Sequence, residues 1–522
     1  MSIVSLVFLG YCLLVVFLYF ILPKRIQPYV LLVASVVFYA LYSYKAFYYL
    51  LFTSLSVFFA AKAVDRLNNE QKNSIDAIET ARLKKKQTLI YSLALIANLC
   101  VLLFLKFYNF SIQNINLLGR VLGLGFSFRT LKILMPLGIS FYTFQAVSYL
   151  IDVKRGKYSA EKRYDRLLLT LIYFPQLIQG PINKYDEMAP QLFRHNTFDI
   201  DRLLSGAQRI AWGFFKKLVI ADRAAVFVNT VFQLGNCHVG LTVFIGVVFY
   251  SLQVYADFSG GIDIVNGFSE ILGIKMMENF RRPFFAETLS DFWQRWHISL
   301  GTWMREYVFY PIAISKRLNR LGKKLRKKGH KKAAKVIPTS LASMVVFFFV
   351  GIWHGASWKY VAYGLYNGII ISGGVLLQDY FDVITHKVFK ANTEVFSWKL
   401  FRILRTFLIV SFGRYLSRAN SLSAAILLLK RTFTNYNPWV LFDGSLLKLG
   451  LDRSEMKVLF FAVLLLLVVS LYQESGHSVR MWLNRQNLYF RVIVQVLFLL
   501  SIAIFGYYGP EFKSANFIYQ GF

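Results

Sequence analysis

Long apolar blocks recur along the whole chain, and they constrain its fold more than any other feature of the sequence. The blocks have about 17–25 residues each, the length that an α-helix needs to cross about 30 Å of hydrocarbon. The first covers residues 2–22, the last covers 492–507, and 56% of the 522 residues are hydrophobic. We therefore predict an all-α integral membrane protein with about eleven transmembrane helices, the first of them retained rather than cleaved as a signal peptide.

The charge of the chain follows these blocks. With 60 Lys and Arg against 27 Asp and Glu, the formal net charge is +33, which in a soluble protein would indicate a nucleic-acid partner. Here the basic residues gather in short loops between apolar blocks, and cytoplasmic loops of membrane proteins attract Lys and Arg. We therefore expect a multi-pass protein of the cell membrane, with the lipid bilayer and no nucleic acid as partner and with its N-terminus outside.

The densest basic run spans residues 316–335 and contains no acid. In one interpretation it is a cytoplasmic loop on anionic lipid, where each cation contributes about 1 kcal/mol. In the other it is an electrostatic funnel for an anionic donor, such as a coenzyme phosphate or an acidic acyl carrier protein. The sequence leaves both interpretations open.

The sequence shows no soluble domain, no low-complexity linker and no internal repeat, so we predict one membrane domain over residues 1–522. We divide it into N-terminal helices (1–106), a catalytic core (135–378) and C-terminal helices (400–522), with an interfacial stretch at 107–134.

Two blocks of the core, at 135–153 and 167–180, are short and are bounded or interrupted by Pro136, Pro175 and Pro181. Broken backbone is tolerated at membrane depth only where protein or a water-filled cavity surrounds it. The middle third is therefore the expected site region.

Two histidines stand out because of their surroundings. His354 lies in the stretch 336–378, whose only formally charged residue is Lys359. Ionisable groups at membrane depth are costly and usually face a cavity or a reaction path. His297 lies in 291–300, where aromatic and charged residues alternate. We predict that the two histidines belong to one site, although each alone also fits a structural histidine bonded to a backbone carbonyl.

The segment around His297 is too polar for an ordinary span and too aromatic for a solvated loop, so we expect a re-entrant or interfacial element. If 291–305 is one helix, Trp293 and His297 are neighbours at i, i+4.

Acids also occur in an apolar block, at Asp257 and Asp263. We expect these carboxylates to pair with Arg281, Arg282 or Arg295, or else to take part in the chemistry.

The sequence lacks the motifs of phosphate loops, nucleophile elbows and His-Glu-x-x-His metal sites, so we expect no metal. Imidazoles in an apolar cavity suit proton abstraction from an alcohol, and attack of that alcohol on an acyl thioester needs little else than an oxyanion donor from a Trp or Asn side chain.

These blocks resemble the membrane-bound O-acyltransferase family, in particular its bacterial alginate O-acetylation branch. The similar segments are 135–144, 174–181, 257–283, 291–300, Trp353-His354-Gly355 and a C-terminal Phe517-Ile518-Tyr519. The resemblance implies helices around a central tunnel, with His354 as catalytic residue and His297 at the second signature position. We expect the substrate contacts to come from Trp293, Arg295, Trp296, Trp353, Asp291 and Asn279.

The resemblance also implies a reaction. An acyl group, expected to be acetyl from acetyl-CoA, would move from a cytoplasmic thioester across the membrane to an extracellular polysaccharide acceptor, with no bound cofactor and with an extracytoplasmic acyltransferase as partner. The alternatives are D-alanyl transfer to teichoic acid from an acyl carrier protein, and a non-catalytic export channel or scaffold. The chain reads Pro311-Ile312-Ala313-Ile314 where the alginate branch has a Pro-Leu-Gly-Gly turn, so the identity of the polymer stays open.

Overall fold

The computed structural model describes residues 3–233 and 238–508, and in this part the chain is helical apart from turns, loops and one isolated β-bridge. Seven helices of the described part are long and apolar enough to cross a membrane, or eight if the bent pair Trp358–Leu376 and Gln378–Val388 counts as one span. The prediction of an all-α membrane protein is confirmed, whereas the count of eleven and the central tunnel stay predictions. The C-terminal match at 517–519 lies outside the described residues.

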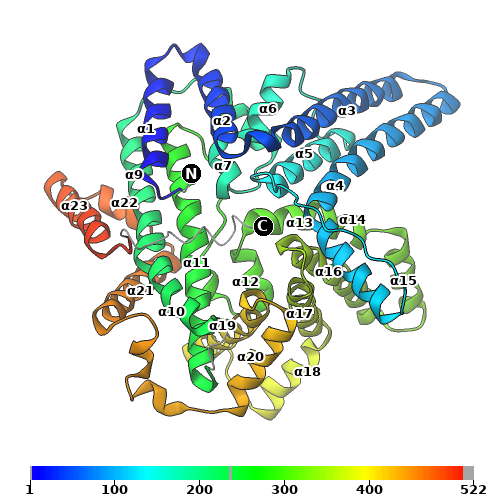
Figure 1. Ribbon diagram of the computed structural model, residues 1–522. Helices are drawn as coiled ribbons and strands as arrows, with labels where there is room; N and C mark the ends of the chain where they lie inside the picture. The colour runs from blue at the N-terminus through cyan, green and yellow to red at the C-terminus, as the bar shows by residue number, and fades with distance from the viewer. Residues whose placement is uncertain (1–2, 234–237, 509–522) are drawn as a thin grey trace. The chain divides into compact units, whose positions relative to one another are not determined.

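The contacts divide the chain into two compact units (Figure 1). Among the described residues, the first consists of the chain up to Ile210 and of Ile262–Met277, and the second of Ala211–Gly261 and of the residues from Glu278 to Tyr508. The grouping into N-terminal helices, core and C-terminal helices stays a prediction.

The first unit contains α1 (Leu6–Ile21), α2 (Gln27–Ser43), α3 (Phe47–Asn73), α4 (Ala77–Val121), α5 (Ile139–Lys154), α6 (Tyr164–Ile172), α7 (Phe174–Gln179), α8 (Tyr185–Leu192) and most of α9 (Ile200–Phe214). Helices α3 and α4 lie side by side as a long pair (Figure 1).

Helix α4 corrects one prediction. The N-terminal helices were expected to end at residue 106, but α4 runs for 45 residues and ends only at Val121. An interfacial position of 107–134 stays a prediction. Asp76 caps its start by accepting hydrogen bonds from the backbone N–H groups of Ile78 and Glu79. Because residues 107–118 contain neither proline nor glycine, nothing in their backbone chemistry stops the helix.

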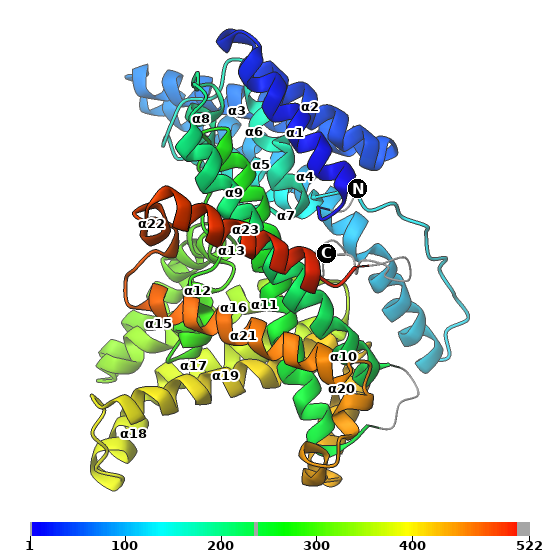
Figure 2. The same cartoon turned by 90° about the vertical axis from the view of Figure 1, so that its left-hand side faces the viewer.

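The second unit contains α10 (Asp222–Phe232), most of α11 (Gly240–Ile271), α12 (Leu289–Arg295), α13 (Ile298–Met304), α14 (Tyr310–Ala313), α15 (Lys316–Lys327), α16 (Lys331–His354), α17 (Trp358–Leu376), α18 (Gln378–Val383), α19 (Phe396–Arg418), α20 (Leu422–Thr434), α21 (Arg453–Glu474), α22 (Val479–Asn484) and α23 (Leu488–Phe505). Helix α17 packs against α16 and against α19 (Figure 2).

The basic run at 316–335 forms α15 and the first turns of α16 instead of a loop. Ser315 caps α15 by accepting a hydrogen bond from the backbone N–H of Leu318. Lys and Arg are good helix formers, and no residue of α15 is buried. A short basic helix of this kind is typical of elements that lie on a membrane surface.

Helices α16 and α17 touch through their backbones at two glycines. A Cβ on Gly364 would lie 2.3 Å from the carbonyl oxygen of Phe347, and a Cβ on Gly351 would lie 2.5 Å from that of Tyr360. Small residues allow helices in a membrane to approach this closely. The contact fixes the end of α16, where His354 lies, against the start of α17.

Replacing Gly364 by alanine should therefore separate α16 from α17 and destabilise the protein by about 1–3 kcal/mol, the usual cost of overpacking. Thermal melting of the detergent-purified protein measures this effect. The matched control is Gly373→Ala on the same helix, because a Cβ on Gly373 meets no atom within 4 Å. Equal melting temperatures for the two variants would contradict the close contact.

Candidate functional site

His354 is the last residue of α16, directly before the turn into α17. The side chain is 6% exposed, and its ring lies 4.9 Å from that of Trp353, 5.8 Å from Tyr363 and 6.2 Å from Tyr360. The turn needs a glycine at Gly355, since a Cβ there would lie 2.7 Å from the ring of Tyr360. His354 is thus held in an aromatic cage at the end of a helix.

His297 lies between α12 and α13, so the prediction of one helix over 291–305 is wrong. Its backbone is left-handed, with φ of 49°, a conformation that is uncommon outside glycine. The helix is interrupted because the segment at Asn279 and Phe280 competes for the backbone. Phe280 pairs with Trp296 in the β-bridge, and the carbonyl of Asn279 accepts the N–H of Ile298 at 3.1 Å.

The break turns His297 away from Trp293, its expected neighbour. The imidazole of His297 is 1% exposed and lies 4.9 Å from the ring of Phe258 and 5.4 Å from that of Trp353. Trp353 therefore contacts both imidazoles, at 5.4 Å for His297 and 4.9 Å for His354. The structure brings the two histidines and Trp353 into one buried cluster, which we call the histidine cluster.

Burial lowers the pKa of His297 from the usual 6.5 to about 3, so this imidazole is neutral near pH 7. Between these two values the unfolded chain binds a proton that the folded chain does not. The stability contributed by neutral His297 is therefore complete above pH 6.5 and is lost as the pH falls towards 3.

We expect the melting temperature to fall between about pH 7.5 and pH 5, and to fall less in His297→Asn, which cannot titrate there. Asparagine is the suitable replacement because it tolerates the left-handed backbone. Parallel pH profiles of the two proteins would contradict the lowered pKa.

Unpartnered polar groups lie beside His297. Asn279 is completely buried, and its Oδ1 accepts the backbone N–H of Ser299 at 3.0 Å. Its Nδ2 has no hydrogen-bond partner, and neither has the Oγ of buried Ser299. Two donors are therefore available at the start of α13, where an oxyanion could accept them.

The other predicted contact residues, in α12 and directly after it, have partners of different kinds. Asp291 accepts a hydrogen bond from Arg295 at 2.8 Å, and Arg295 also pairs with Glu474 at 2.8 Å. Trp293 donates its Nε1–H to Asn367 at 3.1 Å, and its ring faces Tyr363 at 6.5 Å. Trp293 thus supports the cage of His354 through Tyr363, whereas Asp291 and Arg295 are engaged in ion pairs. Trp296, 1% exposed, is stacked on Phe292.

The acids of α11 have partners other than those predicted. Asp257 pairs at 2.6 Å with Lys217, which also pairs with Asp222 at 2.8 Å, and Asp263 pairs with Arg209 at 3.0 Å. Of the arginines expected to meet them, Arg282 and Arg295 instead share Glu474. Burial, and to a smaller extent the second carboxylate beside Lys217, raises the pKa of Asp222 to about 7. No group of three or more His, Cys, Asp or Glu in the described part could hold a metal ion.

Sequence reasoning missed Tyr363, Asn367 and Arg414. The first two could have been found, because Lys359, Tyr363 and Asn367 follow one another at intervals of four and so share a face of α17. Arg414, which lies over Trp296 at 4.9 Å, had no such signal.

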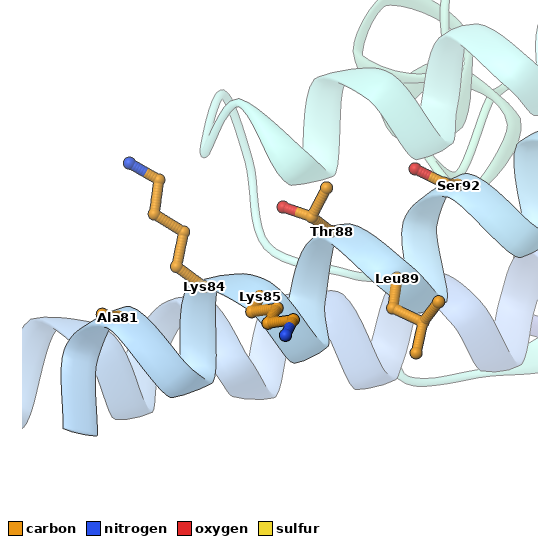
Figure 3. A pocket seen from close by; sticks show the side chains of 6 residues that line it. All are labelled: Ala81, Lys84, Lys85, Thr88, Leu89 and Ser92. Carbon is orange, nitrogen blue, oxygen red and sulfur yellow. The ribbon is translucent and has the colours of Figure 1, made fainter. Parts of the chain in front are cut away.

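An open hollow occurs on α4 (Figure 3), lined by Ala81, Lys84, Lys85, Thr88, Leu89 and Ser92. All six residues come from one helix of the first unit, and none is a predicted site residue. The hollow is the surface of a helix and carries no chemistry that we can assign.

Comparisons with known proteins agree on one family. Residues 167–417 match the model of MBOAT, the membrane-bound O-acyltransferase family. The chain is 31% identical to the probable alginate O-acetylase AlgI of Pseudomonas syringae pv. tomato over 393 aligned residues. This alignment covers 74% of this chain and 70% of the relative. Identity is 29% to the peptidoglycan O-acetyltransferase of Helicobacter pylori, over 77% of this chain and 72% of the relative. Identity is 28% to the teichoic acid D-alanyltransferase of Bacillus subtilis, over 54% of this chain and 68% of the relative.

Proposed function

Since the chain belongs to the membrane-bound O-acyltransferase family and is a multi-pass membrane O-acyltransferase, we propose that it passes an acetyl group from a cytoplasmic thioester across the membrane to a hydroxyl group destined for an extracellular polysaccharide. The observation that carries this proposal is the histidine cluster, in which His297 and His354 flank one indole inside the second unit. Relatives named for alginate and peptidoglycan O-acetylation support an acetyl group and a polysaccharide.

In the proposed reaction His354 is the general base. Its neutral imidazole takes the proton of the acceptor hydroxyl, and the hydroxyl oxygen attacks the thioester carbonyl. The carbonyl oxygen becomes an oxyanion, which the free donors of Asn279 and Ser299 would stabilise. When the tetrahedral intermediate collapses, the C–S bond breaks and the thiolate takes the proton from His354. One ester and one thiol are formed for each thioester consumed.

His297 has a positioning role in this proposal. Because it is buried and neutral, it adds no charge that would draw water into the cluster. Its ring instead packs on Trp353 and holds the indole against His354. Trp293 supports the other side of the His354 cage through Tyr363, and Trp296 packs on Phe292 directly before His297.

The donor is proposed to be acetyl-CoA, which would bind as substrate and not as a resident cofactor. The basic helix α15 attracts anions electrostatically, and basic segments lie in the cytoplasm, so α15 and an external N-terminus agree with a cytoplasmic donor. An extracytoplasmic acyltransferase is the proposed partner for the final transfer to the polymer.

The test is release of free CoA from acetyl-CoA by the purified protein in lipid nanodiscs, with a soluble oligosaccharide that offers its hydroxyl groups directly in place of the partner protein. Turnover that requires both the protein and the acceptor is the expected result. A parallel assay with a D-alanyl-loaded acyl carrier protein tests the teichoic-acid alternative, which has support from a relative of that name. An export channel or scaffold would consume neither donor.

A further inference from the structure

Arg414 on α19 is a buried cation without a counter-charge. Its side chain is 3% exposed, and neither its Nε nor its Nη2 has a hydrogen-bond partner. Among the described residues no carboxylate lies within ion-pair distance of it. Its guanidinium carbon lies 4.9 Å from the ring centroid of Trp296.

An unpaired buried charge is among the most destabilising groups that a protein can contain. The second unit avoids this problem elsewhere, since Lys217 has two carboxylates at 2.6 and 2.8 Å and Arg295 has Asp291 and Glu474. Arg414 instead keeps two free donors in the planar arrangement that suits a carboxylate or a phosphate. A guanidinium of this kind can be balanced by a ligand.

The residues next to Arg414 connect it with the histidine cluster and with the cage of His354. Trp296, on which the guanidinium lies, directly precedes His297. On the other side, a Cβ on Gly413 would lie 3.3 Å from the ring of Tyr363, which contacts His354. An anion held by Arg414 would therefore lie beside the proposed reacting groups.

Two further cations continue from Arg414 towards the turn between α16 and α17. Arg418, one helical turn later, donates to the Oδ1 of Asn229 at 2.9 Å, and Lys359 donates to the carbonyl of Ala419 at 2.7 Å. Neither of them pairs with a carboxylate in the described part of the chain. We call Lys359, Arg418 and Arg414 the cation row.

The cation row lies at the end of α16 that is remote from the basic run. Helix α16 begins at Lys331 within that run and ends at His354 after 24 residues, a length of about 36 Å. If the basic run faces the cytoplasm, the start of α17, which carries Lys359, lies towards the other side of the membrane.

We propose that the cation row binds an anionic oxygen group of the acceptor, a carboxylate or a phosphate, and so places the acceptor hydroxyl at His354. This inference rests on the proposed function, because it assigns the anion to the acceptor and not to the donor. It makes Arg414 a specificity-determining residue. The enzyme should prefer charged acceptors to neutral ones of the same shape.

The first experiment measures binding and needs no turnover. Purified protein is melted with a uronic-acid oligomer, with the methyl ester of that oligomer, and with a glycerol-phosphate oligomer. We expect the charged oligomers to raise the melting temperature and the methyl ester to have little effect, and we expect Arg414→Met to abolish the difference. The better of the two charged oligomers shows whether the anion is a carboxylate or a phosphate.

The matched control is Arg405→Met on the same helix, an exposed arginine that donates to the carbonyl of Glu287. It should keep the preference for charged oligomers. A wild-type protein without that preference, or an Arg414→Met variant that retains it, would overturn the proposal.

The melting temperature of Arg414→Met without anion distinguishes a ligand-binding role of Arg414 from a structural role. Without anion, Arg414→Met should melt at or above the temperature of the wild type, because it removes an unpaired buried charge. A clearly lower melting temperature would identify the guanidinium as structural and overturn the proposal. If Arg414→Met does not fold at all, Arg414→Lys and Arg418→Met replace it, and each should weaken the preference for charged oligomers about tenfold.

The last comparison excludes the donor as the source of the anion. Acetyl-CoA carries phosphates and acetylpantetheine carries none, so their relative binding reports any contact to the donor phosphates. We expect this ratio to be equal in the wild type and Arg414→Met. A changed ratio would assign the cation row to the donor, against the proposal. A protein that binds charged oligomers but does not turn over either donor would count against the proposed function alone.

Discussion

Replacing His354 by glutamine should lower acetyl transfer by about 10²–10⁴-fold, the contribution that general-base catalysis typically makes. Glutamine fills most of the space of the imidazole inside the cage of Trp353, Tyr360 and Tyr363, so we expect the melting temperature to change little. Glutamine cannot accept the proton of the acceptor hydroxyl. CoA release and thermal melting, measured on the same sample, separate the loss of chemistry from a loss of fold.

The control for this variant is His330→Gln, since His330 is exposed and precedes α16. It should retain full turnover. If His354→Gln is as active as the control, the histidine is structural and the proposed mechanism is wrong. If it loses activity and stability together, the cage and not the base is responsible for the effect.

The second large effect is expected at Asn279. Asn279→Asp keeps an oxygen that can accept the N–H of Ser299, as Oδ1 does at 3.0 Å, but it removes the Nδ2 donor. If that donor binds the oxyanion, kcat should fall by about 10²–10³-fold with little change in KM. Steady-state kinetics with acetyl-CoA measure both constants.

Two variants complete this experiment. Asn279→Ala also removes the bond to Ser299, so it should melt well below Asn279→Asp, because a buried N–H is then left without its partner. Asn73→Asp, at the exposed end of α3, should leave kcat unchanged. A kcat for Asn279→Asp close to that of the wild type would remove the amide from the proposed mechanism.

The class of fold could be predicted because it depends on local properties of the sequence. Apolar blocks as long as a bilayer is thick require helices whatever the rest of the chain does, and the structure has seven or eight of sufficient length among its described residues. The end of α4 was mispredicted for the opposite reason. A drop in hydropathy after residue 106 indicates more polar surroundings for the helix, but it does not interrupt the backbone hydrogen bonds of the helix.

The interruption at His297 could not be predicted, because its cause lies in another segment. The carbonyl of Asn279 accepts the N–H of Ile298, and the N–H of Arg281 donates to the carbonyl of Arg295 at the end of α12. A local pattern does not contain that competition. The partners of Asp257 were missed for the same reason, since Lys217 precedes it by 40 residues.

Much of the candidate site was nevertheless visible in the sequence. Both histidines were recognised because polar residues in apolar or aromatic surroundings are costly. Their common neighbour, Trp353, could be named as a residue of the site, but its position between the two rings depends on how α16 packs. Arg414 was missed because one arginine in a helix that contains several has no distinguishing pattern before its burial is known.

The contact between Gly351 and Gly364 determines which part of the enzyme can move during a reaction cycle. Where two helices meet backbone to backbone, neither can slide or rotate without a collision, because no side chain lies between them to change its rotamer. His354, three residues after Gly351, is therefore held in a fixed position relative to α17. We expect the thioester arm and the acceptor to meet at this histidine, each arriving from its own side of the bilayer.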